Sequence, residues 1–265
     1  FNNMILRLEL AVAIEIKYFA LTRFMPTFLE RQFSLEIVDN VITCENVETG
    51  EINKKELQQK YNIPPIKFTG VIDRVDVNGK NISIIDYKSS QSDFSLDSLE
   101  LGFISQILTY ALACEMMFGK NSEDILGIFY REIAKLGKDL KTYRLRGLAN
   151  SDLILDDEFY EKAPDIMYVR TTKAKKIHGA DSHKAFTSPE LEKLVNKNLD
   201  NIMKLLEKII AFDFSLDNYE IDNQYCTEKQ TLFNFASNSD TRLNYREIVE
   251  LKPKELKEKI LNDLR

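Results

Sequence analysis

The sequence is poor in the residues that build several common kinds of site. It has three cysteines in 265 residues, and no two of them have the spacing typical of zinc and redox motifs. Scattered thiols are unsuited to a disulfide scaffold and indicate a reducing compartment, so we expect a cytoplasmic protein. We also expect Cys44 and Cys114 to be buried, because free cysteine behaves as a small hydrophobic residue. The two histidines, His178 and His183, lie in a polar stretch without metal-ligand spacing.

Long apolar runs, phosphate-binding loops and excess positive charge are also absent. No run approaches the roughly 18 apolar residues of a transmembrane helix, and the N-terminus has no charged-then-apolar signal segment. No GxxxxGK[ST] loop occurs, which excludes an ATP-driven motor within this sequence. The net charge of −6 argues against a general, charge-driven grip on nucleic acid but allows a local basic face.

The hydrophobic fraction of 44% is enough for a substantial core. Apolar periodicity predicts helices over 3–24, 98–118 and 188–211, and a last helix from near Pro253. Extended patterns predict strands over 28–38, 125–133 and 141–148, with a hairpin over 68–88. We expect residues 45–63 to form a short helix or an excursion. This order of elements predicts an α/β domain with a mixed sheet.

The stretch GVIDRVDVNGKNISIIDYKSS, residues 70–90, holds the residues that point to chemistry. Asn78-Gly79 is the strongest kind of two-residue turn signal. With that pair in the turn, Val77 lies opposite Lys80, and the register of the whole hairpin follows.

In this register two aspartates meet on one face of the hairpin. Asp73 and Asp86 become diagonal neighbours, roughly 7 Å apart at Cα. Lys88 shares their face because side chains two residues apart point to the same side of a strand, whereas Tyr87 points to the other side.

Such a pair of carboxylates favours a metal ion. Without a cation the two charges repel, and one carboxylate would hold a proton. A Mg²⁺ ion bound by both carboxylates removes that repulsion, because its positive charge lies between them. Its bonds to oxygen ligands are about 2.0–2.1 Å long. A neighbouring lysine can orient a water and offset negative charge, a common arrangement for attacking phosphodiesters. The alternative is a surface salt bridge between Lys88 and either aspartate.

The form GVIDRVD, then DYKSS, then Gln106 and Tyr110, resembles the PD-(D/E)XK nuclease superfamily. It is most similar to the RecB-type branch, and within it to nuclease domains of the AddB/RexB type, over about residues 27–133. The resemblance implies a restriction-endonuclease-like α/β core, a mixed β-sheet flanked by helices, with a C-terminal helical tail. It divides the chain into an exonuclease domain over 1–215, with its core at about 27–150, and a tail over 216–265 that packs on the core.

The resemblance also assigns roles to the residues. It implies a Mg²⁺ or Mn²⁺ site whose ligands are Asp73, Asp86 and the backbone carbonyl of Tyr87. Lys88 is then the catalytic lysine.

Gln106 and Tyr110 match the QxxxY helix motif of the branch. They are four residues apart and so share one helical face. There they would touch DNA phosphate or orient Lys88, and a helix that merely packs with a polar edge is the alternative.

The branch usually has a further His or Glu ligand on a helix upstream of the sheet. Glu9 and Glu15 lie on the first predicted helix, but no motif singles out either. We therefore expect this ligand to lie before residue 1 or to be lost. Glu30 matches a position that is often acidic in the family, with a structural role as the alternative.

The tail departs from the family pattern. Many AddB-type domains hold an iron–sulfur cluster, and QYCTEKQTLFNF resembles its C-terminal segment. Cys226 would be the middle cysteine of that segment, but Asn223 and Leu232 occupy the positions of the other two. One thiolate cannot hold a cluster that needs about four, so we expect no iron–sulfur cluster.

The resemblance thus implies a metal-dependent DNA exonuclease domain that works beside a helicase–nuclease partner of the AddA/RexA type in double-strand break repair and recombination. Because the sequence begins with Phe1 rather than methionine, we expect it to be the tail of a longer polypeptide. Two alternatives stay open. One is a catalytically inactive nuclease-fold scaffold that binds DNA or partner proteins, and the other is a standalone phage-type exonuclease.

Overall fold

The protein is built on one mixed sheet of eight strands in the order β3-β2-β1-β4-β5-β6-β7-β8. The computed structural model describes residues 2–90, 92–132, 144–156, 167–213, 218–219, 245–246 and 252–263. The strands are β1 (Met25–Val38), β2 (Val41–Glu45), β3 (Ile52–Glu56), β4 (Ile66–Asn78), β5 (Asn81–Lys88), β6 (Ile125–Glu132), β7 (Arg146–Asn150) and β8 (Ala185–Phe186). Neighbouring strands are antiparallel except for the parallel pairs β5–β6 and β7–β8.

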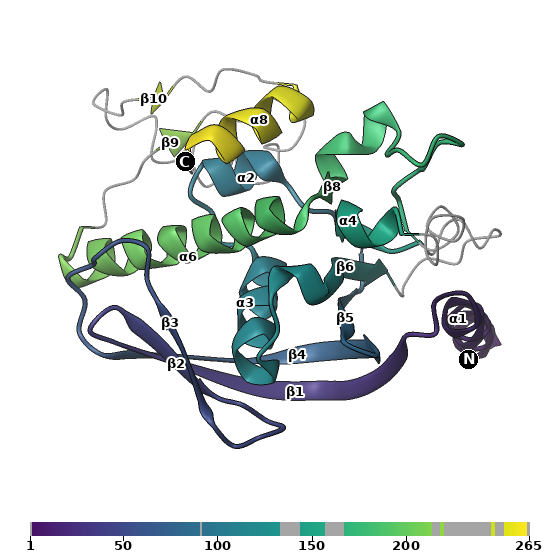
Figure 1. Ribbon diagram of the computed structural model, residues 1–265, viewed down its shortest axis with the longest axis horizontal. Coiled ribbons are helices and arrows are strands. Elements are labelled where there is room, and N and C mark those ends of the chain that lie inside the picture. The colour runs from purple at the N-terminus through teal and green to yellow at the C-terminus, as the bar shows by residue number, and fades with distance from the viewer. Residues whose placement is uncertain are drawn as a thin grey trace.

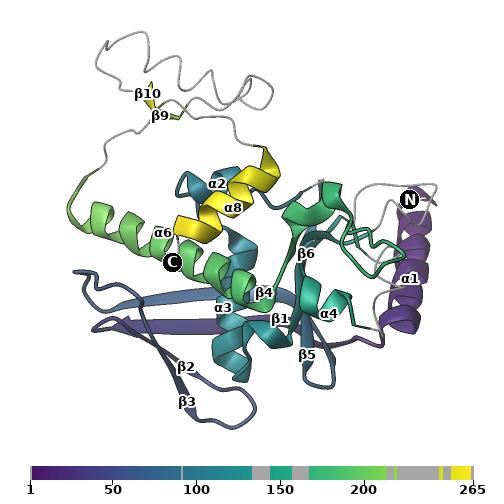
Figure 2. The same cartoon turned by 45° about the horizontal axis from the view of Figure 1, so that its top comes forward.

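Helices cover both faces of this sheet (Figure 1). The helix α3 (Gln106–Phe118) packs between the sheet and the long α6 (Ser188–Ile210), with α2 (Leu96–Glu100) and α8 (Pro253–Asp263) beyond α6, as Figure 2 also shows. The other face carries α1 (Asn2–Thr22) and α4 (Ser151–Ile154). Two short 3₁₀ turns, a two-stranded pair and these helices complete the described elements: η1 (Ser122–Asp124), η3 (Gly179–Lys184), β9 (Asn218–Tyr219) and β10 (Tyr245–Arg246).

The centre of the sheet is buried on both sides, and β5 shows why. Ile84 belongs to the apolar cluster under α3 and α6, whereas Ile85 belongs to the cluster under α1. Successive side chains of a strand point to opposite faces, so a strand covered on both sides needs an almost continuous apolar run. Asp86 at 2% exposure interrupts that run within the buried part of β5.

The predicted helix over 98–118 is wrong in one respect, because the chain forms two helices there. α2 ends at Glu100, and α3 begins only at Gln106. Between them Gly102 takes a φ of 90°, a conformation that residues with a side chain rarely adopt. The apolar periodicity on both sides of the break hid it from the sequence.

Residues 45–63 form no helix, so of the two alternatives expected for this segment the short helix is wrong. β3 runs from Ile52 to Glu56 and is the edge strand beside β2. Its polar side chains reach α3, since Asn53 Nδ2 donates to the carbonyl of Met116 at 2.6 Å. The polar residues that suggested a solvent-exposed helix instead bind an edge strand to α3.

Cys44 and Cys114 are buried, as predicted. None of the helices within the described residues is long and apolar enough to cross a membrane. Residues 141–143 of the predicted strand over 141–148 lie outside the described residues, as do Asn223, Cys226 and Leu232 of the tail. The domain boundary near 215 stays a prediction.

Candidate active site

The hairpin turn lies one residue later than predicted. Asn78 pairs with Asn81, so Gly79 and Lys80 form the turn, with Gly79 at a φ of 58°. Asn78 stays in the strand, where its side-chain amide donates to the carbonyl of Thr22 at 3.3 Å. In the observed register, the partner of each residue lies two positions further along the opposite strand than in the predicted register. Because the side-chain period of a strand is two, every side chain keeps its predicted face.

The corrected register brings the two aspartates closer than diagonal neighbours. The ladder between β4 and β5 ends at Arg74 and Ile85, and the next position along it sets Asp73 opposite Asp86. There the strands no longer pair, and Asp73 Oδ2 instead accepts the backbone N–H of Tyr87 at 2.8 Å. The two carboxylates therefore stand where the hairpin opens.

A chain of polar contacts leads from this point to α3. Lys88 Nζ lies 2.6 Å from Asp86 Oδ2 and donates to Gln106 Oε1 at 2.7 Å. Gln106 Nε2 then donates to the hydroxyl of Tyr110 at 2.7 Å. The structure thus brings the sequence-predicted residues of β5 and α3 into one continuous line, starting beside Asp73.

The electrostatics of the site favour a cation. Burial raises the pKa of Asp86 and Asp73 raises it further, while Lys88 opposes both effects. Burial also raises the pKa of Tyr130 to about 12, with a smaller contribution from Asp86. The Lys88 ammonium lies 5.6 Å from the centre of the Tyr130 ring. Negative charge is therefore crowded here, and one lysine partly offsets it.

A third carboxylate borders the pair. Glu30 lies on β1 between residues that pair with Arg74 and Ile72, so its register position is across from Asp73. Its φ of 48° is unusual for a residue with a side chain inside a strand. Glu30 is also among the charges that raise the pKa of Tyr110, behind burial and the two aspartates.

The donor atoms suit a hard divalent ion. Two carboxylates and the carbonyl of Tyr87 are all oxygen donors, the kind that Mg²⁺ and Mn²⁺ prefer. Within the described part of the chain no three His, Cys, Asp or Glu side chains are close enough to hold a metal by themselves. The set still fits Mg²⁺, since this ion usually keeps several waters and takes one or two carboxylates.

Comparison with known proteins now decides the family. A model of the PD-(D/E)XK nuclease superfamily matches residues 6–228. The chain belongs to this superfamily. Membership confirms the predicted family and, together with the mixed sheet flanked by helices, the predicted restriction-endonuclease-like fold.

Two curated relatives illustrate the likeness, and both are the B-type subunit of an ATP-dependent helicase/deoxyribonuclease. The chain is 30% identical over 216 residues to the relative from Carboxydothermus hydrogenoformans, covering 69% of this chain and 19% of the relative. It is 24% identical over 249 residues to the relative from Streptococcus pyogenes serotype M6, covering 89% of this chain and 23% of the relative. The chain thus spans about a fifth of the length of these relatives.

The opposite face of the PD-(D/E)XK hairpin holds a charge cluster that the sequence analysis missed. Arg74 donates to both carboxylate oxygens of Asp76 at 2.6 and 2.7 Å, and to Glu15 and the Tyr87 hydroxyl at 2.8 Å each. Glu15 also pairs with Arg131 at 3.3 Å. The sequence did contain an indication of this cluster. In GVIDRVD, Arg74 and Asp76 are two residues apart and therefore share one face of the strand, opposite to the face of Asp73.

This cluster is deeply buried. Arg74 is 2% exposed and Asp76 is fully buried. Burial raises the pKa of Asp76, an effect that Arg74 opposes, and burial would lower the pKa of Arg74, but its bonds to Asp76 raise it above its usual value. Arginine stays charged in proteins, so we treat the pair as ionised. Glu15 lies here, across the sheet from the aspartate pair.

The glycine of the nuclease motif has a packing role. A Cβ on Gly70 would lie 2.6 Å from ring atoms of Phe33. That ring meets Tyr110 edge-on, with centroids 6.1 Å apart. Gly70 therefore lets an aromatic side chain lie against the strand and support the end of the polar line.

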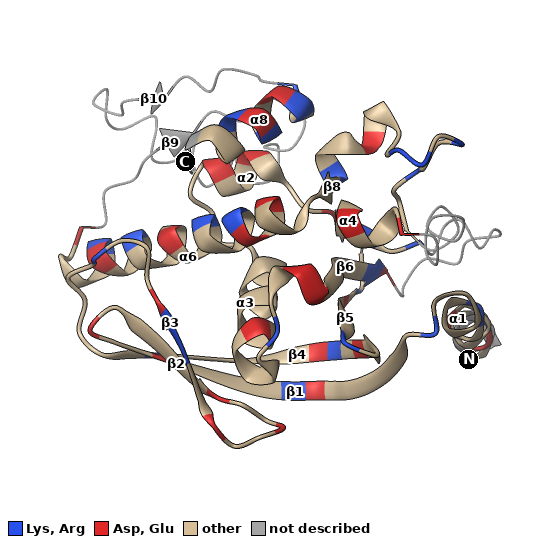
Figure 3. Ribbon diagram, viewed as in Figure 1, with Lys and Arg blue, Asp and Glu red and all other residues tan. Residues whose placement is uncertain are grey.

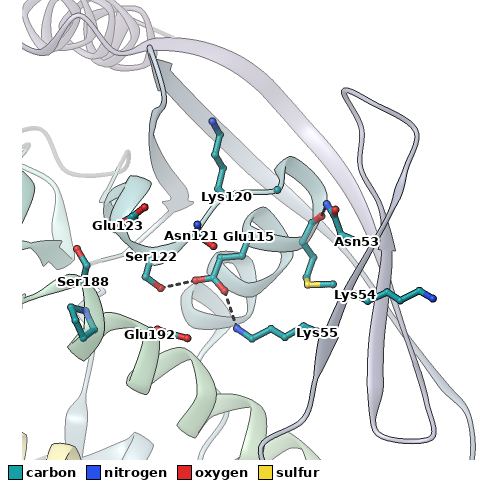
Figure 4. Close-up of a pocket in the computed structure, with 13 residues that line it drawn as sticks. Asn53, Lys54, Lys55, Glu115, Lys120, Asn121, Ser122, Glu123, Ser188 and Glu192 are labelled. Carbon is teal, nitrogen blue, oxygen red and sulfur yellow. Dashed lines mark hydrogen bonds and ion pairs between the residues drawn. The ribbon is translucent and has the colours of Figure 1, made fainter.

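A separate polar hollow of about 590 Å³ lies at the other end of α3 (Figure 4). Glu115 accepts hydrogen bonds there from Lys55 at 3.1 Å and from Ser122 at 2.7 Å. None of the sequence-predicted site residues lines it. This hollow is therefore separate from the candidate site at Asp73 and Asp86.

Proposed function

We propose that this chain is a metal-dependent DNA exonuclease domain that hydrolyses phosphodiester bonds within a helicase–nuclease of the AddAB/RexAB type. The observation that carries the proposal is the unbroken line from Asp86 through Lys88 and Gln106 to Tyr110, beside Asp73. A salt bridge on the surface would need neither the buried carboxylate nor the ordered amide and hydroxyl behind it.

In this proposal three groups hold the ion. Asp73, Asp86 and the carbonyl of Tyr87 would bind Mg²⁺ or Mn²⁺, which when bound polarises the phosphate and lowers the pKa of water. The Asp73 carboxylate is already oriented, because the Tyr87 N–H fixes one of its oxygens. In this proposal the other oxygen binds the ion.

Lys88 would orient the attacking water and offset the negative charge that develops on the phosphate. Gln106 holds the Lys88 ammonium at 2.7 Å, so the lysine has a fixed position. Tyr110 in turn accepts a hydrogen bond from the Gln106 amide and keeps that amide oriented. Gln106 and Tyr110 are thus positioning residues in this proposal.

The partners follow from the relatives and from charge. By their names, the relatives belong to an ATP-dependent helicase/deoxyribonuclease. This sequence has no ATP-binding phosphate loop and a net charge of −6. We therefore propose that a helicase–nuclease partner of the AddA/RexA type feeds DNA to this domain during double-strand break repair and recombination.

The second candidate is a nuclease-fold scaffold without catalysis. One observation favours it, namely that Lys88 already neutralises Asp86 at 2.6 Å. In a scaffold that ion pair would be the final state of the site. In an enzyme a divalent ion must compete with Lys88 for the carboxylate, and the following measurement separates the two.

Thermal unfolding with EDTA, Mg²⁺ and Mn²⁺ tests the metal site. We expect Mn²⁺ to stabilise the chain, by about 2.7 kcal/mol at 100 times its dissociation constant. Asp86→Ala should abolish the effect. Glu36→Ala is the matched control, because Glu36 is an exposed carboxylate on the same sheet that pairs with Lys67 at 3.2 Å. If Mn²⁺ shifts the Asp86→Ala variant as much as the unmodified chain, the proposed ligands are wrong.

The same site predicts a pH dependence. The pKa of Asp86 is raised in the folded state, so without metal the folded chain binds this proton more tightly than the unfolded chain. Its contribution to stability is therefore present below the ordinary carboxyl pKa of about 4 and is lost as pH rises through the raised pKa.

With Mn²⁺ the trend should reverse, because the ion needs the deprotonated carboxylate. We expect the stabilisation by Mn²⁺ to grow as pH rises from about 4, and to be absent at every pH in Asp86→Asn. A metal effect that stays constant through the titration would contradict this assignment. Calorimetric scans over a pH series provide the measurement.

A further inference from the structure

The loop between α2 and α3 exposes two large apolar side chains shortly before Gln106 of the candidate active site. Phe103 is 50% exposed and Ile104 is 44% exposed. They precede Gln106 by three and two residues, so chain length alone keeps their Cα atoms within about 11 and 7 Å of it. Gln106 itself touches Lys88. Phe103 and Ile104 therefore lie on the segment that leads directly into the proposed nuclease centre.

Buried side chains of α6 fix the backbone of this loop. Asn201 Nδ2 donates to the carbonyls of Leu99 at 2.9 Å and Phe103 at 3.4 Å. Asn198 Oδ1 accepts the N–H of Ser105 at 2.6 Å. Both asparagines are at most 5% exposed, and buried amides are costly unless they are hydrogen-bonded. The loop thus has one well-defined position against α6.

This arrangement leaves part of the apolar surface of the loop in contact with solvent. Full burial of a large apolar side chain contributes about 1.5–3 kcal/mol, and the loop gives up part of that gain at two successive residues. It also interrupts a helix at Gly102, where φ is 90°. A loop held from below with apolar groups above is suited to contact a ligand.

We propose that Phe103 and Ile104 form a platform on which the bases of a single DNA strand rest while its phosphate lies at Lys88. This inference rests on the proposed nuclease function. With a net charge of −6, attraction of phosphates contributes little over the molecule as a whole. Stacking of bases on aromatic side chains is independent of charge and tolerant of sequence, at about 1–3 kcal/mol per base.

A fluorescence titration tests the platform directly. The sequence contains no tryptophan, so Phe103→Trp introduces a single reporter. With EDTA present to prevent cleavage, an unlabelled oligothymidylate should quench this reporter in a saturable manner. Phe212→Trp is the control, because Phe212 is 83% exposed but lies just beyond the far end of α6. An oligomer of abasic sugar phosphates, with the same charge and no bases, should leave both reporters unchanged.

Kinetics provide a second readout. Phe103→Ala should raise KM for a single-stranded substrate by about 5- to 150-fold, the range that 1–3 kcal/mol represents, with little change in kcat. Phe103→Tyr keeps the aromatic face and should restore KM. If Phe103→Trp folds poorly, Ile104→Trp serves as the reporter in the same titration.

The outcomes separate the platform from the proposed function. Absence of quenching, or equal quenching by the abasic strand, would overturn the platform even if the chain cleaves DNA with Mn²⁺. It would mean that this loop serves another contact, such as a protein surface. Absence of Mn²⁺-dependent cleavage in the unmodified chain counts against the nuclease function, and the titration reports binding independently of it.

Discussion

Replacing Lys88 by methionine is expected to lower the rate of phosphodiester hydrolysis by about 10²- to 10⁴-fold, the usual contribution of a positioned group that assists proton and charge transfer. Methionine keeps much of the apolar stem but removes the ammonium that contacts Asp86 and Gln106. Single-turnover cleavage of a labelled strand with saturating Mn²⁺ measures the loss.

The metal site should survive this change, which separates a catalytic defect from a folding defect. Lys88 competes with a divalent ion for the Asp86 carboxylate, so stabilisation by Mn²⁺ is expected to be equal or larger in Lys88→Met. Lys80→Met is the matched control, because Lys80 lies in the turn of the same hairpin with its side chain 68% exposed and paired with Asp124. Full activity in Lys88→Met would remove this lysine from the mechanism.

The largest effect on stability is expected from Asp76→Ala, about 3–5 kcal/mol of the free energy of unfolding. Asp76 is fully buried and accepts two hydrogen bonds from Arg74, itself 2% exposed. Its removal leaves a guanidinium in the core with Glu15 as its remaining carboxylate partner within the described residues. Urea denaturation of the chain measures the change.

The double variant Arg74→Met with Asp76→Ala provides the comparison. Replacing a buried ion pair by apolar groups is often neutral, so the pair should recover most of the stability that Asp76→Ala alone loses. Glu36→Ala in the exposed pair with Lys67 should cost less than about 1 kcal/mol. If the double variant is as unstable as the single one, the cluster matters through its bond to Tyr87 rather than through charge balance.

Much of the site could be predicted because it is local in the chain. The alternation of a strand put Asp73, Asp86 and Lys88 on one face and Tyr87 on the other. That assignment survived a misplaced turn, since pairing partners moved by two positions. The four-residue spacing of Gln106 and Tyr110 likewise predicted one helical face, and the two side chains bond to each other.

The features that could not be predicted depend on contacts between distant segments. The break between α2 and α3 is stabilised by Asn198 and Asn201, about a hundred residues further on. The polar residues of β3 form an edge strand because α3 lies within reach of them. No local pattern carries the position of those partners.

Figure 3 shows the positions of the acidic and basic residues along the chain. The sequence by itself determined the faces of the hairpin and of the Gln106 helix, because periods of two and four residues are properties of the backbone. The order of its elements predicted the α/β class, and its resemblance to a known family implied the residues of the proposed centre. Only the tertiary structure decided that Arg74 and Asp76 are buried with Glu15 of α1, that Glu30 has the register position across from Asp73, and that Phe103 is half-exposed. The physical reason is that burial and charge pairing depend on which elements pack together, and that packing is a property of the whole chain.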